Sequence, residues 1–148
     1  FAVGAASCAM SGEEQKIVRA GEQASYKGPQ ELFTGSVRVD PVFTVTEGIP
    51  AIGGYVTFEP GARSNWHYHP TGQQIIVISG VGRTGTRDGK VEEFRAGDVV
   101  TCPPNVHHWH GAAPTVGMVH LTVTGQADGK NTEWLEPVND QQYAPDGR

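Results

Sequence analysis

The six histidines of the chain are its most chemically suggestive residues, and all of them lie between positions 67 and 120. His67 and His69 are separated by one residue, so on a β-strand both rings project from the same face. Gln73 follows four residues after His69. The Pro70-Thr71-Gly72 turn between them is expected to bring the chain back, so that Gln73 lies near the two histidines. Imidazole serves proteins both as a metal ligand and as a general acid or base near neutral pH, so this region is the candidate functional site.

The histidines belong to two spaced blocks of the sequence. The first reads Gly61-x5-His67-x-His69-x3-Gln73-x6-Gly80, and the second reads Gly97-x5-Pro103-x-Asn105-x2-His108. These blocks resemble the paired motifs of the cupin superfamily, the small antiparallel β-barrels of jelly-roll type, and the resemblance covers roughly residues 50–125. It implies that the barrel holds one divalent metal ion, and that the ligands are His67, His69, Gln73 and His108.

Two positions depart from the usual cupin pattern. Asn105 stands where a glycine is usual, and asparagine tolerates the left-handed backbone conformation that glycine often supplies. Gln73 stands where a glutamate is usual, and a neutral amide leaves a divalent ion its full charge. The ion is then a stronger Lewis acid but is held less tightly, so a barrel that binds a ligand without metal remains an alternative.

Further segments narrow the resemblance to small single-domain bacterial cupins, some of which are manganese-dependent hydroxynitrile lyases of the (R)-mandelonitrile lyase type. The segments are Thr34–Pro41, Thr57–Arg63, His69–Gln73 and His108–Pro114. In that group the metal ligands are three histidines and one glutamine. The resemblance also implies substrate-pocket positions at Gly54, Val56 and Thr124, the last where another polar residue is expected, and a further pocket histidine at His120.

Strand alternation gives an expectation for the other histidines. On the strand through His108, His110 shares the face of His108, whereas His107 and Trp109 point the other way, so we expect His107 outside the barrel. His110 either orients a ligand or is a histidine of the core. His120 shares a face with Met118, Thr122 and Thr124. If that face lines the barrel, His120 lies near the metal and suits general acid–base work; the alternative puts it on the outer face.

The expected function is a metal-dependent carbon–carbon lyase that cleaves or forms α-hydroxynitriles, with His120 as the catalytic acid–base residue. The expected ion is one Mn(II) per chain, with Fe(II), Zn(II) or Ni(II) as alternatives. A dioxygenase or isomerase acting on a small oxygenated substrate is the alternative among enzymes. A non-catalytic cupin that binds a small ligand is the alternative outside them.

The elements that must position these residues are short strands, spaced as in an all-β sandwich or barrel. Gln74–Ser79 is a continuous apolar run, typical of a strand buried on both faces. Asp88-Gly89 marks a hairpin turn between strands at Arg83–Arg87 and Val91–Phe94. The remaining expected elements are an edge strand at Lys16–Ala20, a loop at Ala24–Gln30, strands at Ser36–Val45 (with Pro41 at an edge or bulge), Ala51–Glu59, Asp98–Cys102 and Val116–Thr124, and a turn or short helix within Thr132–Tyr143.

The length and net charge of the chain limit the number of domains and the classes of partner. The length of 148 residues is that of one domain. We expect a flexible arm over residues 1–15 and a cupin barrel over residues 16–148. The two motifs of the barrel lie at 61–80 and 97–112. A net charge of −5 without a basic run argues against nucleic acid as a partner. No run approaches the ~20 apolar residues of a membrane span. A small molecule is the expected partner.

Two further expectations concern assembly and location. The Lys16–Ala20 strand and an apolar outer face at Val119, Leu121 and Val123 predict a homo-oligomer, either a dimer or a tetramer. Cys8 and Cys102 are expected to be free thiols, with Cys102 acting as a small buried apolar residue. The small residues of the opening segment, 1–10, fit a processed signal, a lipoprotein remnant or a cloning scar, which leaves the compartment open between the bacterial cytoplasm, the periplasm and export.

Overall fold

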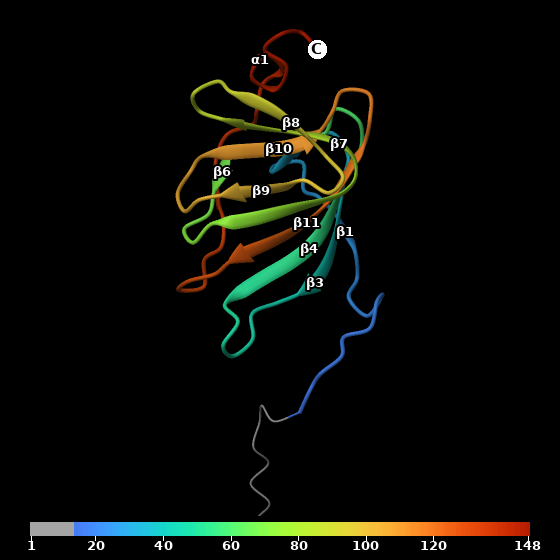
Figure 1. Cartoon of the computed structure of the whole chain (residues 1–148), viewed down its shortest axis with the longest axis vertical. Helices are drawn as coiled ribbons and strands as arrows, with labels where there is room; N and C mark the ends of the chain where they lie inside the picture. Colours follow the sequence, from blue (N-terminus) through green and yellow to red (C-terminus); the bar gives the residue numbers. More distant parts are fainter. Residues whose placement is uncertain (1–13) are drawn as a thin grey trace, which may run out of the picture.

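The computed structural model describes residues 14–148, and they fold into one curled antiparallel sheet (Figure 1). The helix α1 lies at the opposite end of the molecule from the first described residues. The strands are β1 Tyr26–Lys27, β2 Phe33–Thr34, β3 Val37–Phe43, β4 Ala51–Phe58, β5 Arg63–Ser64, β6 His67–Tyr68, β7 Gln73–Thr86, β8 Val91–Arg95, β9 Val99–Cys102, β10 His108–Ala112, β11 Met118–Gly125 and β12 Glu133–Trp134. The helix α1 spans Asp140–Tyr143.

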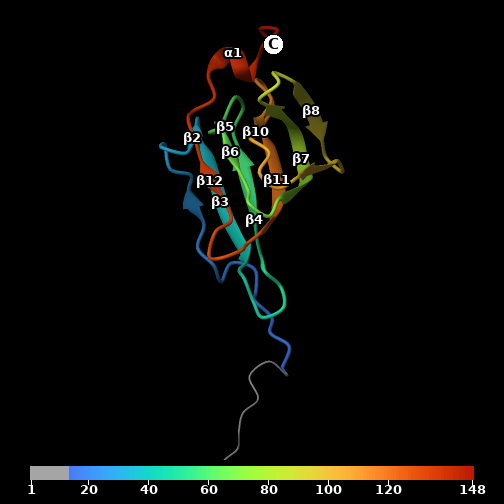
Figure 2. The same cartoon turned by 90° about the vertical axis from the view of Figure 1, so that its left-hand side faces the viewer.

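The sheet curls over into two halves, because one long strand, β7, belongs to both of them. The first half of β7 pairs with β9 and β11, and its second half pairs with β8 and β10. The change takes place at Gly80, whose φ is 79° and where a Cβ atom would lie 1.9 Å from the carbonyl oxygen of Gly117. Only glycine fits there. The outcome is the all-β barrel that the sequence predicts, with one face of each long strand turned inward (Figure 2).

Most predicted strands are present. The Ser36–Val45 strand is β3, and its register with β4 shifts between Pro41 and Phe43, which confirms the expected bulge. Ala51–Glu59 is β4, Asp98–Cys102 contains β9, and the hairpin around Asp88-Gly89 joins β7 to β8. The strand predicted at Val116–Thr124 is β11, beginning two residues later at Met118. The predicted short helix is α1, which is preceded by β12 in the same segment.

Three expectations are wrong. Lys16–Ala20 forms no strand and is exposed, whereas the predicted loop Ala24–Gln30 contains β1, which pairs with β3. The Gln74–Ser79 run is not buried on both faces, because Ile75 and Val77 face inward while Ile78 is 46% exposed. Isoleucine and valine are preferred in strands on either face, so an apolar run alone does not report burial. Of the predicted arm, only residues 14 and 15 are described, and both are exposed.

Two apolar clusters hold the barrel. The first consists of Val37, Phe58, Ala62, Val77, Phe94, Ala112 and Met118. Within it, the Phe58 ring contacts His110 and His120 edge-on, with ring centroids 6.0 and 5.2 Å away. This cluster therefore packs against these two histidines. The second cluster consists of Trp66, Trp109, Val138 and Tyr143 and fastens the C-terminal segment to the outside of the barrel.

Within residues 14–148, no helix is long and apolar enough to cross a membrane.

Candidate metal centre

Three strands and one link between strands bring the candidate ligands together. His67 lies on β6 and pairs with His108 on β10, so the two histidine motifs meet as directly opposed residues. Gln73 begins β7, between Thr124 of β11 and Cys102 of β9. His69 lies in the link between β6 and β7. Strand register therefore gathers residues that are up to 41 positions apart (from 67 to 108) at one point of the barrel.

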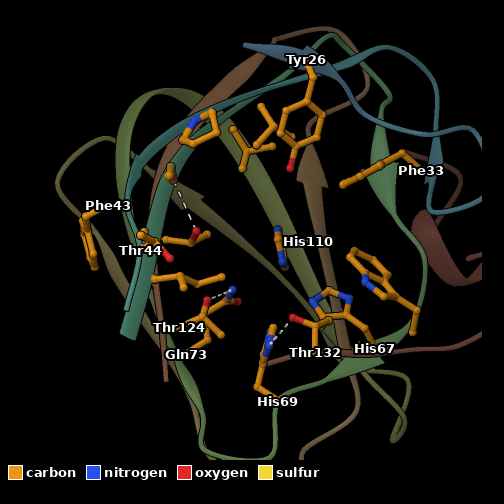
Figure 3. A pocket seen from close by; sticks show the side chains of 18 of the residues that line it. Tyr26, Phe33, Phe43, Thr44, His67, His69, Gln73, His110, Thr124 and Thr132 are labelled. Atoms are coloured by element: carbon orange, nitrogen blue, oxygen red, sulfur yellow. Dashed lines mark hydrogen bonds between the residues drawn. The ribbon is translucent and has the colours of Figure 1, made fainter. Parts of the chain in front are cut away.

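The candidate ligands are buried and close to one another, and Figure 3 shows three of them, His67, His69 and Gln73. The ring centroid of His67 lies 4.4 Å from that of His108 and 5.0 Å from that of His69. The centroids of His69 and His108 are 5.2 Å apart. None of these four side chains, Gln73 included, is more than 8% exposed. They form a compact set of neutral donors shielded from water.

Each imidazole has one nitrogen engaged, which leaves the other free. Nδ1 of His67 lies 2.9 Å from the carbonyl oxygen of Asn65, and Nδ1 of His69 lies 2.8 Å from that of Asn131. A carbonyl only accepts, so both Nδ1 atoms carry the proton and both Nε2 atoms present a lone pair. Nδ1 of His108 lies 3.2 Å from Sγ of Cys102. Hydrogen bonds of this kind orient histidine ligands in metal sites.

The amide of Gln73, like the imidazoles, has one atom in a hydrogen bond and one atom free. Its Nε2 donates to Oγ1 of Thr124 over 2.9 Å, which turns Oε1 away from that contact and leaves it without a partner. An amide oxygen is a ligand that harder divalent ions accept. Thr124 therefore lines the pocket and also orients Gln73.

Five buried side-chain nitrogen or oxygen atoms in the described chain lack a hydrogen-bond partner, and all five belong to this site: His69 Nε2, Gln73 Oε1, His108 Nε2, His110 Nε2 and His120 Nδ1. Buried polar atoms are almost always paired, because an unpaired one costs about 1–3 kcal/mol. Four of the five belong to the neighbouring side chains of His69, Gln73, His108 and His110, and such a group of unpaired atoms fits a cation; the fifth is on His120, whose other nitrogen contacts His110. The residues present therefore suit the divalent metal that the sequence predicts.

The electrostatics of the site favour the neutral, ligating form of its histidines. Burial, followed by the neighbouring His69, lowers the pKa of His67 to about 3. Burial, followed by His67, lowers the pKa of His108 to about 2, and burial also lowers the pKa of His69. A neutral imidazole is the form that binds metal, so these rings need not lose a proton at neutral pH.

His110 lies next to the predicted ligands. Ring nitrogens of His67, His108 and His110 all lie within 4.8 Å of one another, so this triad also has the dimensions of a metal site. Nδ1 of His110 is 2.8 Å from Nε2 of His120, and its Nε2 is unpaired. Of the two expectations for His110, the structure favours a role at the site over a satisfied core histidine.

His120 lies behind His110. It is completely buried, and its inward orientation confirms that the polar face of β11 lines the barrel. Its Nε2 is bonded to His110, so its route to the pocket passes through that ring. Burial lowers the pKa of His120 to about 4. His107 lies outside the site, as expected, and its ring stacks on Tyr68 with centroids 4.8 Å apart.

A cavity of about 330 Å³ opens from the metal site. Gly54, Val56 and Thr124, the pocket positions that the resemblance implies, line it together with His110, whereas the implied pocket histidine His120 is not among its lining residues. A Cβ atom at Gly54 would lie 3.2 Å from the carbonyl oxygen of Asp40, so this wall is already close to the neighbouring strand. Its rim is aromatic: of its lining residues Tyr26, Phe33, Phe43 and Trp134, three are more than a third exposed, and Phe33 packs edge-on against Trp134.

Sequence reasoning missed three residues that contribute to the site. Asn131 and Thr132 contact Nδ1 of His69, at 2.8 and 3.2 Å. Trp134 lies over His67, with ring centroids 4.8 Å apart, and packs edge-on against Phe33. These residues follow the last barrel strand and match neither motif. The tryptophan beside a predicted turn is the one local signal that this segment packs against something.

Comparison with known proteins agrees with this geometry. A family described as "Cupin domain" matches residues 54–124. The chain is 51% identical over 128 residues to a protein of Granulicella tundricola named (R)-mandelonitrile lyase, covering 86% of this chain and 98% of that one.

Two solved structures are also similar to this chain. A cupin-like protein from Thermotoga maritima is 39% identical, with a TM-score of 0.77 over 90% of this chain and all of that one. A cupin-2 domain from Rhodospirillum rubrum shares the fold at 20% identity, with a TM-score of 0.65 over 88% of this chain and 92% of the other. With its barrel, its paired histidine motifs and a 51% identical relative, this chain belongs to the cupin family.

Proposed function

We propose that this cupin is a hydroxynitrile lyase that cleaves an α-hydroxynitrile to an aldehyde and hydrogen cyanide, and catalyses the reverse addition. The observation that carries the proposal is the group of unpaired buried atoms, histidine ring nitrogens and the amide oxygen of Gln73, at the candidate metal site. The name of the 51% identical Granulicella protein supports the choice of reaction. The ligands are His67, His69, Gln73 and His108, and the ion is Mn(II).

When bound, a divalent ion in this position supplies a Lewis acid for the oxygen of the substrate. The protein contributes the proton transfer. Nε2 of His110 accepts the hydroxyl proton while its Nδ1 proton passes to Nε2 of His120, along the 2.8 Å contact between the rings. The C–CN bond breaks, its electron pair leaves with cyanide, and the proton returns to cyanide as the aldehyde forms. His120 thus acts as proton acceptor through His110.

The cavity suits a substrate with an aromatic group. Its rim residues Phe33, Phe43 and Trp134 offer ring faces and edges, and aromatic pairs prefer these offset or edge-on contacts. The polar groups are concentrated at its base, where the hydroxyl and nitrile would lie. An aromatic hydroxynitrile such as mandelonitrile matches this division.

The deciding experiment measures cyanide release from mandelonitrile by the Mn(II)-loaded protein and by its His120→Ala variant. We expect the variant to keep its metal and to lose about 10²–10⁴-fold in rate, mainly in kcat. The control is His107→Ala, which removes an imidazole outside the site and should leave the rate unchanged.

Three outcomes would count against this assignment. Full metal without cyanide release from aromatic and aliphatic hydroxynitriles would reject the lyase; oxygen consumption by the iron-loaded protein would then point to a dioxygenase. Loss of metal in His120→Ala would make His120 a ligand or a support for one. Loss of metal in His110→Ala, with metal retained in His69→Ala, would replace His69 by His110 in the ligand set.

We also propose that the chain forms a homo-oligomer through the outer face of its sheet. Tyr55, Leu121, Ile76 and Val99 pair in one row across four strands and point away from the barrel interior. Val99 is 59% exposed and Tyr55 38%. Extended apolar surface of this kind marks association sites, and symmetric homo-oligomers are the commonest assemblies. Sedimentation equilibrium at micromolar concentration tests this, and a monomer throughout would reject it.

A further inference from the structure

We infer that Cys102 is a positioning residue of the metal centre: its thiol accepts a hydrogen bond from Nδ1 of His108 and so directs Nε2 of that ring towards the ion. This inference rests on the proposed metal site. It gives a role to a buried thiol that the proposed reaction does not use.

The three proposed histidine ligands are oriented by different partners. His67 and His69 are held by backbone carbonyl oxygens, at 2.9 and 2.8 Å. Nδ1 of His108 instead lies 3.2 Å from Sγ of Cys102. Nδ1 of His69 also lies 3.2 Å from Oγ1 of Thr132, but among the described residues only His108 has a side chain in place of a backbone carbonyl as its Nδ1 partner, and mutation can remove that side chain without altering the backbone.

The location of Cys102 ties it to a second ligand. Cys102 ends β9 and pairs in register with Gln73 of β7, and its Sγ reaches across to β10. It therefore lies between two strands that each carry a proposed ligand. The side chain is buried, with the residue only 7% exposed.

The thiol is suited to orienting a ligand. Burial raises the pKa of Cys102 to about 12, so the group stays a neutral thiol at physiological pH. A thiol both donates and accepts weakly. In the metal-free protein the S–H group can donate to Nδ1 of His108. With a metal on Nε2, Nδ1 must carry the proton, and sulfur becomes the acceptor.

The first test compares metal affinity in Cys102→Ala and Cys102→Ser with the parent protein, by competition with a chelator for Mn(II) and for Zn(II). Loss of the partner of a histidine ligand typically weakens metal binding about 10–100-fold, which we expect for Cys102→Ala. Cys102→Ser keeps an acceptor oxygen and should recover most of the affinity. Val37→Ala, which trims a buried side chain of the first apolar cluster, controls for loss of packing and should leave the affinity unchanged.

The second test follows the thiol itself, in a Cys8→Ser background so that one S–H group remains. Zn(II) should shift the S–H stretching band of Cys102 to higher frequency, because the group stops donating to His108. An unshifted band, or a Cys102→Ala affinity equal to that of the parent, would overturn the role of Cys102 while leaving the metal centre intact. A parent protein that binds neither ion would overturn both.

Discussion

The amide of Gln73 has one bonded and one unpaired atom, which would let this neutral side chain act as the proposed ligand where cupins usually carry a glutamate. Its nitrogen donates to Thr124, and this bond turns its oxygen to the cluster of histidines. A carboxylate at this position would still find a partner, because the Thr124 hydroxyl can rotate and donate. The difference between the two residues is therefore one of charge at the ion.

We expect Gln73→Glu to hold Mn(II) at least about tenfold more tightly, because added ligand charge raises affinity for hard cations. Cyanide release should slow, since a partly neutralised ion is a weaker Lewis acid. Titration of the metal and the kcat for mandelonitrile check the two effects. Gln74→Glu adds the same charge on the exposed face of the same strand and should change neither. Unchanged affinity in Gln73→Glu would show that Gln73 is not a ligand.

The element that adds most to the site beyond the motif strands is the segment that follows β11. Asn131 and Thr132 hold His69, and β12 pairs with β6, so that Trp134 lies opposite His67. The segment therefore supports two proposed ligands and also supplies one side of the aromatic rim. The second apolar cluster, with Trp66 and Tyr143, anchors the chain beyond it.

Trp134→Ala should raise the KM for mandelonitrile by about 2–10-fold, because aromatic pairs contribute about 0.5–1.5 kcal/mol beyond the area they bury. The KM for a small aliphatic hydroxynitrile should change less, and Trp134→Phe should restore most of the loss. Steady-state kinetics on both substrates make the comparison. An equal rise for both substrates would mean that Trp134 supports His67 and does not bind the aromatic group.

At the scale of the whole molecule, the buried histidines make the metal-free protein sensitive to acid. Their pKa values are lowered by burial, to about 3 for His67 and about 4 for His120, whereas an unfolded chain binds their protons near pH 6.5. Between these values the unfolded state holds more protons than the folded state. Stability is therefore complete above pH 6.5 and falls as the pH drops towards 4.

We expect the free energy of unfolding of the metal-free protein to fall between pH 6.5 and 4 by about 1.4 kcal/mol per pH unit for each histidine that gains a proton on unfolding. Urea unfolding in the presence of a chelator at several pH values measures this slope. His120→Gln removes one such group and should flatten the slope. A parent protein equally stable at pH 7 and pH 5 would contradict the prediction.

The spacing of residues along the sequence determined which strand face several site residues occupy and which motifs the chain carries. The period of two along a strand puts His67 and His69 on one face and turns His107 away from His110, and the structure has both arrangements. The φ of 65° at Asn105 confirms that asparagine supplies the left-handed conformation expected there. Motif spacing, read through the cupin resemblance, predicted the barrel and the residues that meet at its centre.

Tertiary structure alone decided what surrounds those residues. Lys16–Ala20 has the composition of a strand but finds no partner, and β1 forms instead where β3 offers an open edge. The contacts of Cys102 with His108, of Asn131 with His69 and of His110 with His120 join residues on different elements. Side-chain periodicity states which face of a strand a residue occupies. Which residue lies across from it depends on how the barrel closes, and that is settled only when distant strands pair.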